Sequence, residues 1–148
     1  MSVGFAVGDG DVAKIQTILE RLLADTGCAA VVLSSRDGAS LAAAGAARAL
    51  DMVSMAALAA GGFSSTAPLA HLLGEREFSV LIHEGVRQSL HVSAVDEATI
   101  LVAVFDERTT VGMVRVFARE AATKLAAILS ETRARRADGH RRSTRGPT

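Results

Sequence analysis

The sequence predicts one domain of the α/β class, more narrowly α+β, in which helices cover an antiparallel sheet of five strands. Three observations support this. The chain of 148 residues has the length of a single domain. Segments near both ends and in the middle space their apolar residues as helices do. Between them lie short β-rich runs joined by tight turns, and such connections pair strands antiparallel. With five Phe, no Tyr and no Trp, the core must be mostly aliphatic.

The first helix is predicted at residues 10–25. Asp9 or Asp11 can cap its N-terminus, and Gly27 stands where helices commonly end. Residues 1–9 are small and irregular, so we predict no regular structure there. The apolar positions of the helix form one stripe: Val12, Ile15, Ile18, Leu19, Leu22 and Leu23.

A strand pair should follow the first helix. Residues 29–33 form an apolar run typical of a buried strand, and residues 39–44 return as a second strand. Asp37 and Gly38 between them are a strong hairpin signal, because both residue types tolerate the turn backbone.

The middle helix is predicted at residues 52–73, with Asp51 as its N-cap. Gly61 and Gly62 each weaken a helix by about 1 kcal/mol relative to Ala. Pro68 has no N–H to donate to the turn before it. We therefore expect a kink or break at residues 62–67, where Thr66 could recap the second half.

Three further strands and a final helix complete the order α-β-β-α-β-β-β-α. The strands are predicted at residues 77–84, 87–95 and 98–106, as a meander with short turns. The last helix is predicted at residues 110–134, with Thr109 or Thr110 as N-cap and arginines near its C-terminus, where the helix dipole favours them.

The net charge of zero hides an uneven distribution. Residues 1–132 hold fifteen acidic and ten basic residues, whereas residues 133–148 hold six arginines and one aspartate. The last segment has no apolar periodicity and contains Gly139, Gly146 and Pro147. We therefore divide the chain into an irregular start, a domain at 10–132 and a basic tail at 133–148 that we expect to be disordered.

No catalytic or metal-binding constellation emerges from the sequence. His83-Glu84 is followed three residues later by Arg87, where a zinc helix of the H-E-x-x-H type needs histidine, and His91 stands at no helical spacing. The single cysteine, Cys28, begins an apolar run and is expected to be a buried thiol. Neither lysine follows a glycine, which excludes a Walker-type phosphate loop. We expect no enzyme activity, metal or cofactor.

The sequence also limits which macromolecular partners we expect. We expect no membrane-spanning helix and a cytoplasmic protein, because no apolar run of about 20 residues and no secretory signal are evident. Nucleic acid is a poor fit, since the body is acidic and lacks aromatic residues for stacking on bases. The apolar middle helix and the strand at 77–84, which would leave an open edge, both call for a protein partner.

The element order and several local stretches resemble the Roadblock/LC7 family, over about residues 10–130, and within it the bacterial regulators of gliding motility and cell polarity. The stretches are "LAAG" at 58–61, "LAHLLGEREF" at 69–78, "HEG" at 83–85, "SLHV" at 89–92 and "VFDERTTVGMVR" at 104–115.

The resemblance implies a strand order of 2-1-5-4-3, with the first and third helices on one face and the second on the other. It also implies a homodimer in which the third strands pair and the second helices pack together. The dimer contacts would include Met55, Leu58, Ala59, Phe78, Val80 and Ile82.

The resemblance further implies a function. Such dimers bind a small Ras-like GTPase and accelerate its GTP hydrolysis by repositioning the switch elements of the GTPase, without an arginine finger. The GTPase-facing positions would be Ala57, Ala60, Gly61, Ser64, Ser65 and Pro68. The alternative is a Roadblock dimer that serves as a scaffold and leaves GTP turnover unchanged.

Overall fold

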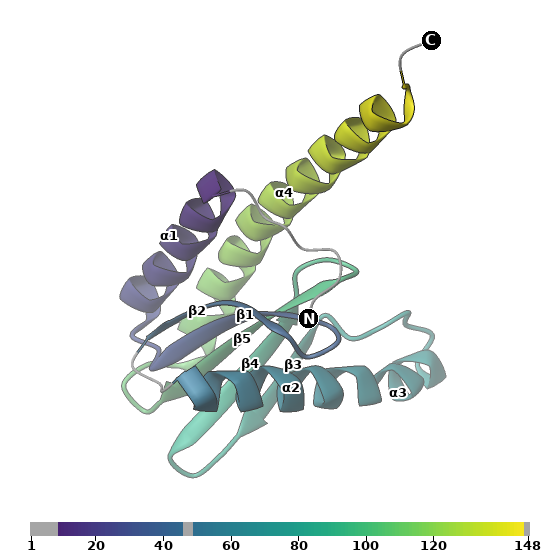
Figure 1. Ribbon diagram of the computed structural model, residues 1–148. Coiled ribbons are helices and arrows are strands. Elements are labelled where there is room, and N and C mark those ends of the chain that lie inside the picture. Colours follow the sequence, from purple (N-terminus) through teal and green to yellow (C-terminus); the bar gives the residue numbers. More distant parts are fainter. Residues whose placement is uncertain (1–8, 46–48, 147–148) are drawn as a thin grey trace.

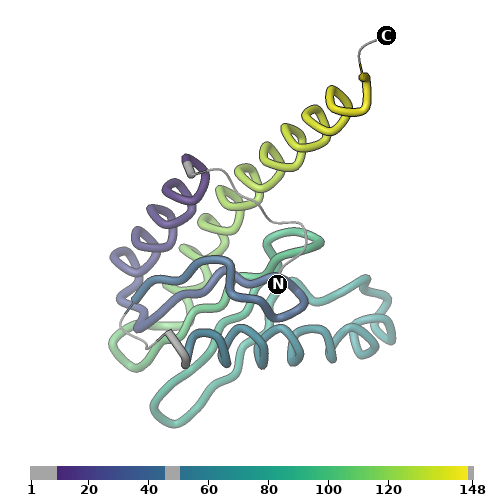
Figure 2. Tube along the Cα trace, viewed as in Figure 1, coloured from purple at the N-terminus to yellow at the C-terminus, as the bar shows by residue number. Residues whose placement is uncertain are grey.

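The computed structural model describes residues 9–45 and 49–146, and the side chains of Asp9, Ala49 and Leu50 are not part of that description. The expected irregular start falls on residues 1–8, outside the described range, and on Asp9, which already belongs to a helix. Figures 1 and 2 show a sheet between two helical layers, from which one helix projects well beyond the sheet.

A five-stranded antiparallel sheet forms the middle layer, in the order β2-β1-β5-β4-β3. This confirms the predicted order and leaves β2 and β3 as edge strands. The strands are β1 (Ala30–Ser35), β2 (Ser40–Gly45), β3 (Val80–Glu84), β4 (Gln88–Ala94) and β5 (Thr99–Asp106).

Helices cover both faces of the sheet, as predicted (Figure 1). Helices α1 and α4 lie against one face, and α2, continued by the short α3, lies against the other. The helices are α1 (Asp9–Thr26), α2 (Ala49–Ser65), α3 (Ala67–Leu72) and α4 (Val111–Thr144).

The central strand β1 supplies both cores, because successive side chains point to opposite faces. Val31 and Leu33 pack with α1 and α4, whereas Ala30 and Val32 pack beneath α2. All six residues of the strand are buried. A strand buried on both faces reads as a continuous apolar run, which is how residues 29–33 appear in the sequence.

The predicted break in the middle helix is present, at Thr66 between α2 and α3. Thr66 occupies the N-cap position of α3, with Pro68 in the first turn, but it makes no side-chain cap. Its hydroxyl instead donates to the carbonyl oxygen of Phe63 at 2.7 Å. The recapping role expected for Thr66 is therefore wrong, because this hydroxyl closes the end of α2.

Asp11 is not a helix cap either. It lies inside α1, and its carboxylate accepts hydrogen bonds from the Thr132 hydroxyl at 2.9 Å and from the Arg135 guanidinium. The side chain is only 7% exposed. It joins the first helix to the last across 121 residues of sequence.

The last helix ends ten residues beyond its predicted end, at Thr144 instead of residue 134. Its start agrees, since Thr110 accepts a hydrogen bond from the Met113 backbone nitrogen at 3.2 Å. Its end at Thr144 contradicts the expected disorder of the basic segment, and the boundary drawn at residue 132 falls inside the helix. Propagating an existing helix costs far less than nucleating one, and Ala and Arg are good helix formers. Arg133 and Arg135 also hold the helix to the body, through Asp96 and Asp11.

Candidate functional site

Helices α2 and α3 present the most unusual surface of the molecule. Their inner side packs on the sheet through four nearly buried residues, Met52, Ala56, Ala60 and Phe63. The opposite side is open to solvent in this chain. Between Asp51 and Glu75 the sequence has no Asp, Glu, Lys or Arg, so this open side carries no fixed charge.

The expected GTPase-facing residues mostly lie on that open side. Ala57, Gly61, Ser64, Ser65 and Pro68 are all exposed. Ala60 is not: it is 2% exposed and belongs to the core beneath α2. Predicting Ala60 as a partner contact is therefore wrong, because the helical period places it with Ala56 and Phe63 against the sheet.

The glycines of α2 have no packing reason within the chain. A Cβ added at Gly61 or Gly62 would meet no atom within 4 Å, and neither residue has a positive φ. Gly38, by contrast, is required: its φ is +93° and an added Cβ would lie 2.9 Å from the Cα of Ala57. Gly61 and Gly62 thus weaken the helix without relieving any crowding, which points to close approach by another molecule.

Large apolar side chains surround this flat strip. Leu58 is 77% exposed, and Leu69, Leu72 and Leu73 of the α3 region are 55%, 83% and 68% exposed. Scattered exposed leucines are ordinary, but a contiguous uncharged strip marks an interaction surface. We call the open side of α2 and α3, with these leucines, the apolar strip.

By length and composition, Asp51–Leu72 is apolar enough to cross a membrane, with a mean hydropathy of 1.2. Our expectation that no segment is long and apolar enough is therefore wrong. The small residues Ala, Gly and Ser make this segment look only weakly apolar, but they add no charge, so its mean hydropathy stays high enough. Core helices of globular proteins meet the same criterion, although only 22% of this window is buried. The inner side of α2 packs on the sheet, so only its outer side, the apolar strip, is left exposed. A membrane-spanning helix would instead contact lipid or other helices on all sides.

The expected dimer contacts divide between the two faces of the sheet. Met55 is half-buried, Leu58 is exposed and Ala59 is 9% exposed, all on α2. Val80 and Ile82 pair with Ser93 and His91, and these register positions share the α4 side of the sheet. Phe78, half-buried, precedes β3. The set thus falls into two groups, one on α2, which packs mainly on β1, β2 and β5, and one on or just before the edge strand β3.

The residues considered for chemistry do not converge. His83 is exposed on the edge strand, whereas His91 is buried on the neighbouring one. Within residues 9–45 and 49–146, no group of three or more His, Cys, Asp or Glu could hold a metal ion. Burial raises the pKa of the Cys28 thiol, against a smaller opposite effect of its hydrogen bond with Thr26, so the thiol stays protonated and unreactive.

Comparisons with known proteins agree with this arrangement of sheet and helices. The family model described as the Roadblock/LC7 domain matches residues 14–105, more than half of the chain. The chain belongs to the Roadblock/LC7 family. The match runs from α1 to the end of β5, so α4 lies beyond it.

Solved structures of MglB resemble this Roadblock chain along most of its length. Myxococcus xanthus MglB is 35% identical, with a TM-score of 0.75 over 80% of this chain and 96% of that one. The gliding protein MglB from Thermus thermophilus is 31% identical, with a TM-score of 0.83 over 88% and 99%. An MglB with a tetrameric arrangement is 31% identical, with a TM-score of 0.84 over 89% and 99%. No curated protein sequence matches the chain.

Arg36 is a residue of the Roadblock domain that the sequence did not single out. Its guanidinium donates to both carboxylate oxygens of Glu77, at 2.7 and 3.0 Å, and to the carbonyl oxygen of Asp96. It also lies 5.5 Å from the centre of the Phe63 ring, a cation–π distance. The hydrogen bond from Arg36 lowers the pKa of Glu77. Arg36 therefore fixes the segment between α3 and β3 relative to α2, and its partners, far away along the chain, give no local sequence signal.

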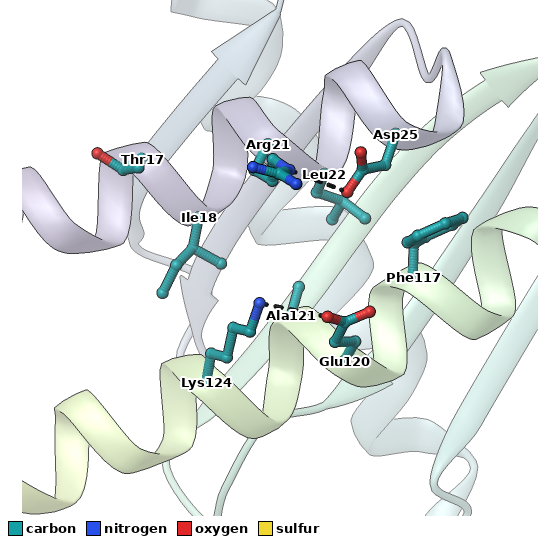
Figure 3. A pocket seen from close by; sticks show the side chains of 9 residues that line it. All are labelled: Thr17, Ile18, Arg21, Leu22, Asp25, Phe117, Glu120, Ala121 and Lys124. Carbon is teal, nitrogen blue, oxygen red and sulfur yellow. Dashed lines mark hydrogen bonds and ion pairs between the residues drawn. The ribbon is translucent and has the colours of Figure 1, made fainter.

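A groove between α1 and α4 is a weaker candidate site (Figure 3). It has a volume of about 390 Å³, and charged residues line it. They neutralise one another within each helix: Arg21 pairs with Asp25 at 3.4 Å and Lys124 with Glu120 at 3.3 Å (Figure 3). Because these charges are already paired, the groove is a poor candidate for binding a charged ligand.

Proposed function

We propose that this protein is a homodimeric regulator that stimulates GTP hydrolysis by a small Ras-like GTPase of the MglA kind. The observation that carries the proposal is the apolar strip, with two glycines that face open space on a chain 31–35% identical to MglB. A cytoplasmic setting follows from such a partner.

A homodimer buries the two surfaces that a single chain leaves exposed, the edge of β3 and the outer side of α2. Pairing of β3 with its copy satisfies the backbone groups of a free edge, and packing of two α2 helices buries the side chains around Leu58. The GTPase then contacts the part of the strip that the dimer leaves accessible, at the exposed positions Ala57, Gly61, Ser64, Ser65 and Pro68. These side chains are small, so the switch elements of the partner can approach the helix backbone closely.

In this mechanism the regulator acts by contact with the switch elements of the GTPase and contributes no charged group to its active site. The strip carries no Arg or Lys, so it offers nothing to stabilise charge on the transferring phosphoryl group directly. Arg36, which lies 5.5 Å from the Phe63 ring of α2, is held by Glu77 and by the carbonyl oxygen of Asp96. Beyond α3, Arg76 pairs with Glu97 at 3.5 Å, and Arg87 lies in the turn between β3 and β4. Arg48 lies outside the described residues. Stimulation therefore comes from holding the switch elements of the GTPase in a competent arrangement.

The test is GTP hydrolysis by a purified Ras-like GTPase of the MglA kind, measured with and without this protein. Ser64→Arg should abolish stimulation, because a long charged side chain stands where the partner must approach. Ser130→Arg, at an exposed position of α4, is the matched control and should stimulate normally. Wild-type stimulation by Ser64→Arg would show that the strip is the wrong surface.

A second set of variants tests the mechanism. Arg76→Ala and Arg87→Ala should each lower turnover far less than the roughly 10³–10⁵-fold expected of an arginine finger. Loss of all stimulation with unchanged binding in either variant would mean that a finger operates. Binding by the wild type without any change in turnover would favour the scaffold alternative.

A further inference from the structure

A second cavity lies on the other face of the sheet, between α4 and the strands β3 and β4. Its volume is about 630 Å³, within the size range of small-ligand sites. Apolar side chains form much of its wall, with polar groups from two elements. The polar residues that matter are His91 and Ser93 of β4, and Arg115 and Arg119 of α4.

The floor of the cavity holds polar atoms without partners. His91 is 1% exposed and Ser93 is 5% exposed, and both residues line the cavity. Neither ring nitrogen of His91 nor the hydroxyl of Ser93 makes a hydrogen bond within the described residues. Each buried polar atom left unpaired costs free energy, so such groups in a folded protein usually have a ligand, an ion or water beside them.

The wall supplied by α4 is cationic and unneutralised. Arg115 and Arg119 are four residues apart, hence on the same side of the helix. Among the described residues, the cavity lining includes no Asp or Glu, and neither arginine forms an ion pair. This is the opposite of the α1–α4 groove, where each charge has a partner one turn away.

We propose that this cavity is a binding site for a small phosphate-bearing ligand, held by Arg115 and Arg119 from α4 and by His91 and Ser93 from β4. A phosphomonoester carries a charge of about −1.5 to −2 at neutral pH, which matches two guanidinium groups. Its oxygens accept hydrogen bonds from the planar guanidinium forks. The Ser93 hydroxyl, which has almost no accessible surface, donates to the ligand once it turns toward the cavity. The apolar wall accommodates the rest of the ligand.

The state of His91 suits this role. Burial lowers the pKa of His91, and the positive charge of Arg115 lowers it further, so the imidazole is neutral at neutral pH. A neutral imidazole donates one hydrogen bond without adding a third charge. The cavity is separate from the apolar strip, which lies on the opposite face of the sheet. The cavity lining includes Val80, one of the expected dimer contacts on β3, so pairing of β3 in the proposed dimer would place a second copy beside it.

The experiment is a titration of the full chain with inorganic phosphate at constant ionic strength, against the same titration with chloride. Binding is followed by calorimetry and by the NMR signals of the His91 ring. We expect saturable binding at millimolar phosphate, with the His91 signals moving along the same curve and no such response to chloride.

Arg115→Gln combined with Arg119→Gln should weaken phosphate binding about tenfold or more, since each removes a charge-assisted hydrogen bond. Both side chains are exposed, so the thermal midpoint should stay near that of the wild type. Lys124→Gln is the matched control: it removes one positive charge from the same helix outside the cavity, and it should bind as the wild type does.

Three outcomes would overturn the proposal. The first is no saturable binding of phosphate, as expected if water or an acidic side chain of a second copy occupies the cavity. The second is equal binding by the double variant, which would mean a different site. The third is calorimetric binding with unmoved His91 signals, which would also place the phosphate elsewhere.

Discussion

The two faces of the sheet are covered in different ways. On one face, α1 and α4 pack side by side (Figure 1). Several of their charged residues form ion pairs, within each helix for Arg21 and Lys124 and between the helices for Arg135 and Asp11. On the other face, one broken helix made of small and apolar residues stands alone. The two helices cover the first face apart from the cavity lined by Arg115 and Arg119, whereas the apolar strip on the second face stays open to solvent. We therefore expect substitutions in the core of the first face to act mainly on folding and substitutions in the strip to act mainly on association.

The largest effect on folding is expected on the two-helix face. Leu125 is fully buried between α4 and the sheet, and Leu125→Ala should lower the free energy of unfolding by about 2–5 kcal/mol, from lost burial and the cavity left behind. Urea denaturation measures this. A loss below about 1 kcal/mol would mean that this face is less tightly packed than the structure indicates.

The opposite face should separate folding from association. Leu58→Glu changes a side chain that is 77% exposed, so the fold of one chain should lose little, within about 0.5 kcal/mol. The dimer should dissociate, because a carboxylate would be buried in the packed helix pair. Analytical ultracentrifugation of Leu58→Glu beside the wild type measures this. A wild-type protein that sediments as a folded monomer at micromolar concentration would contradict the whole comparison.

His91 should give the two-helix face a dependence on pH. Because its pKa is lowered from 6.5 in the folded state, the unfolded chain binds more protons as the pH falls below about 6.5. Stability should therefore decline from that pH downward through the lowered pKa, by about 1.4 kcal/mol for each pKa unit of difference. Urea denaturation between pH 5 and 7.5, in buffers without phosphate, should show this slope in the wild type and a flatter profile in His91→Leu.

The smallest effect is expected at the end of α4. Deleting residues 137–148 removes exposed side chains and keeps Arg135 and Arg136, so stability should change by about 0.5 kcal/mol or less. Arg135→Ala should cost more, about 1 kcal/mol, because among the described residues it leaves the Thr132 hydroxyl as the remaining side-chain donor to the buried Asp11 carboxylate. Thermal denaturation ranks the two. If the deletion costs more than Arg135→Ala, the distal turns pack on the domain more strongly than their exposure indicates.

The sequence predicted the elements whose signal is local. The hairpin at Asp37-Gly38, the break near Pro68 and the cap at Thr110 each depend on residues within one or two turns, and all three are present. The strand order came from the family resemblance and is confirmed by the topology.

Features made by distant residues were missed. Asp11 reads as a cap in sequence, yet it pairs with residues more than 120 positions away. The phase of α2 was also misjudged at Ala60, because a helix made largely of alanine and glycine has almost no amphipathic contrast to show which side faces the sheet. The end of α4 was misread because composition alone does not record that a stable helix already precedes the arginines.

Because the end of α4 projects from the domain, the negative and positive charges of this electrically neutral chain are separated in space. Residues 1–132 carry a formal charge of −5 and residues 133–148 carry +5. The turns after Thr132 extend about 18 Å at 1.5 Å per residue, whereas charges in physiological salt are screened over about 8 Å. The distal Arg141, Arg142 and Arg145 therefore keep their own field instead of being cancelled by the acidic body. A charged surface would exert a torque on such a molecule before contact, so ionic strength should govern the angle at which it arrives.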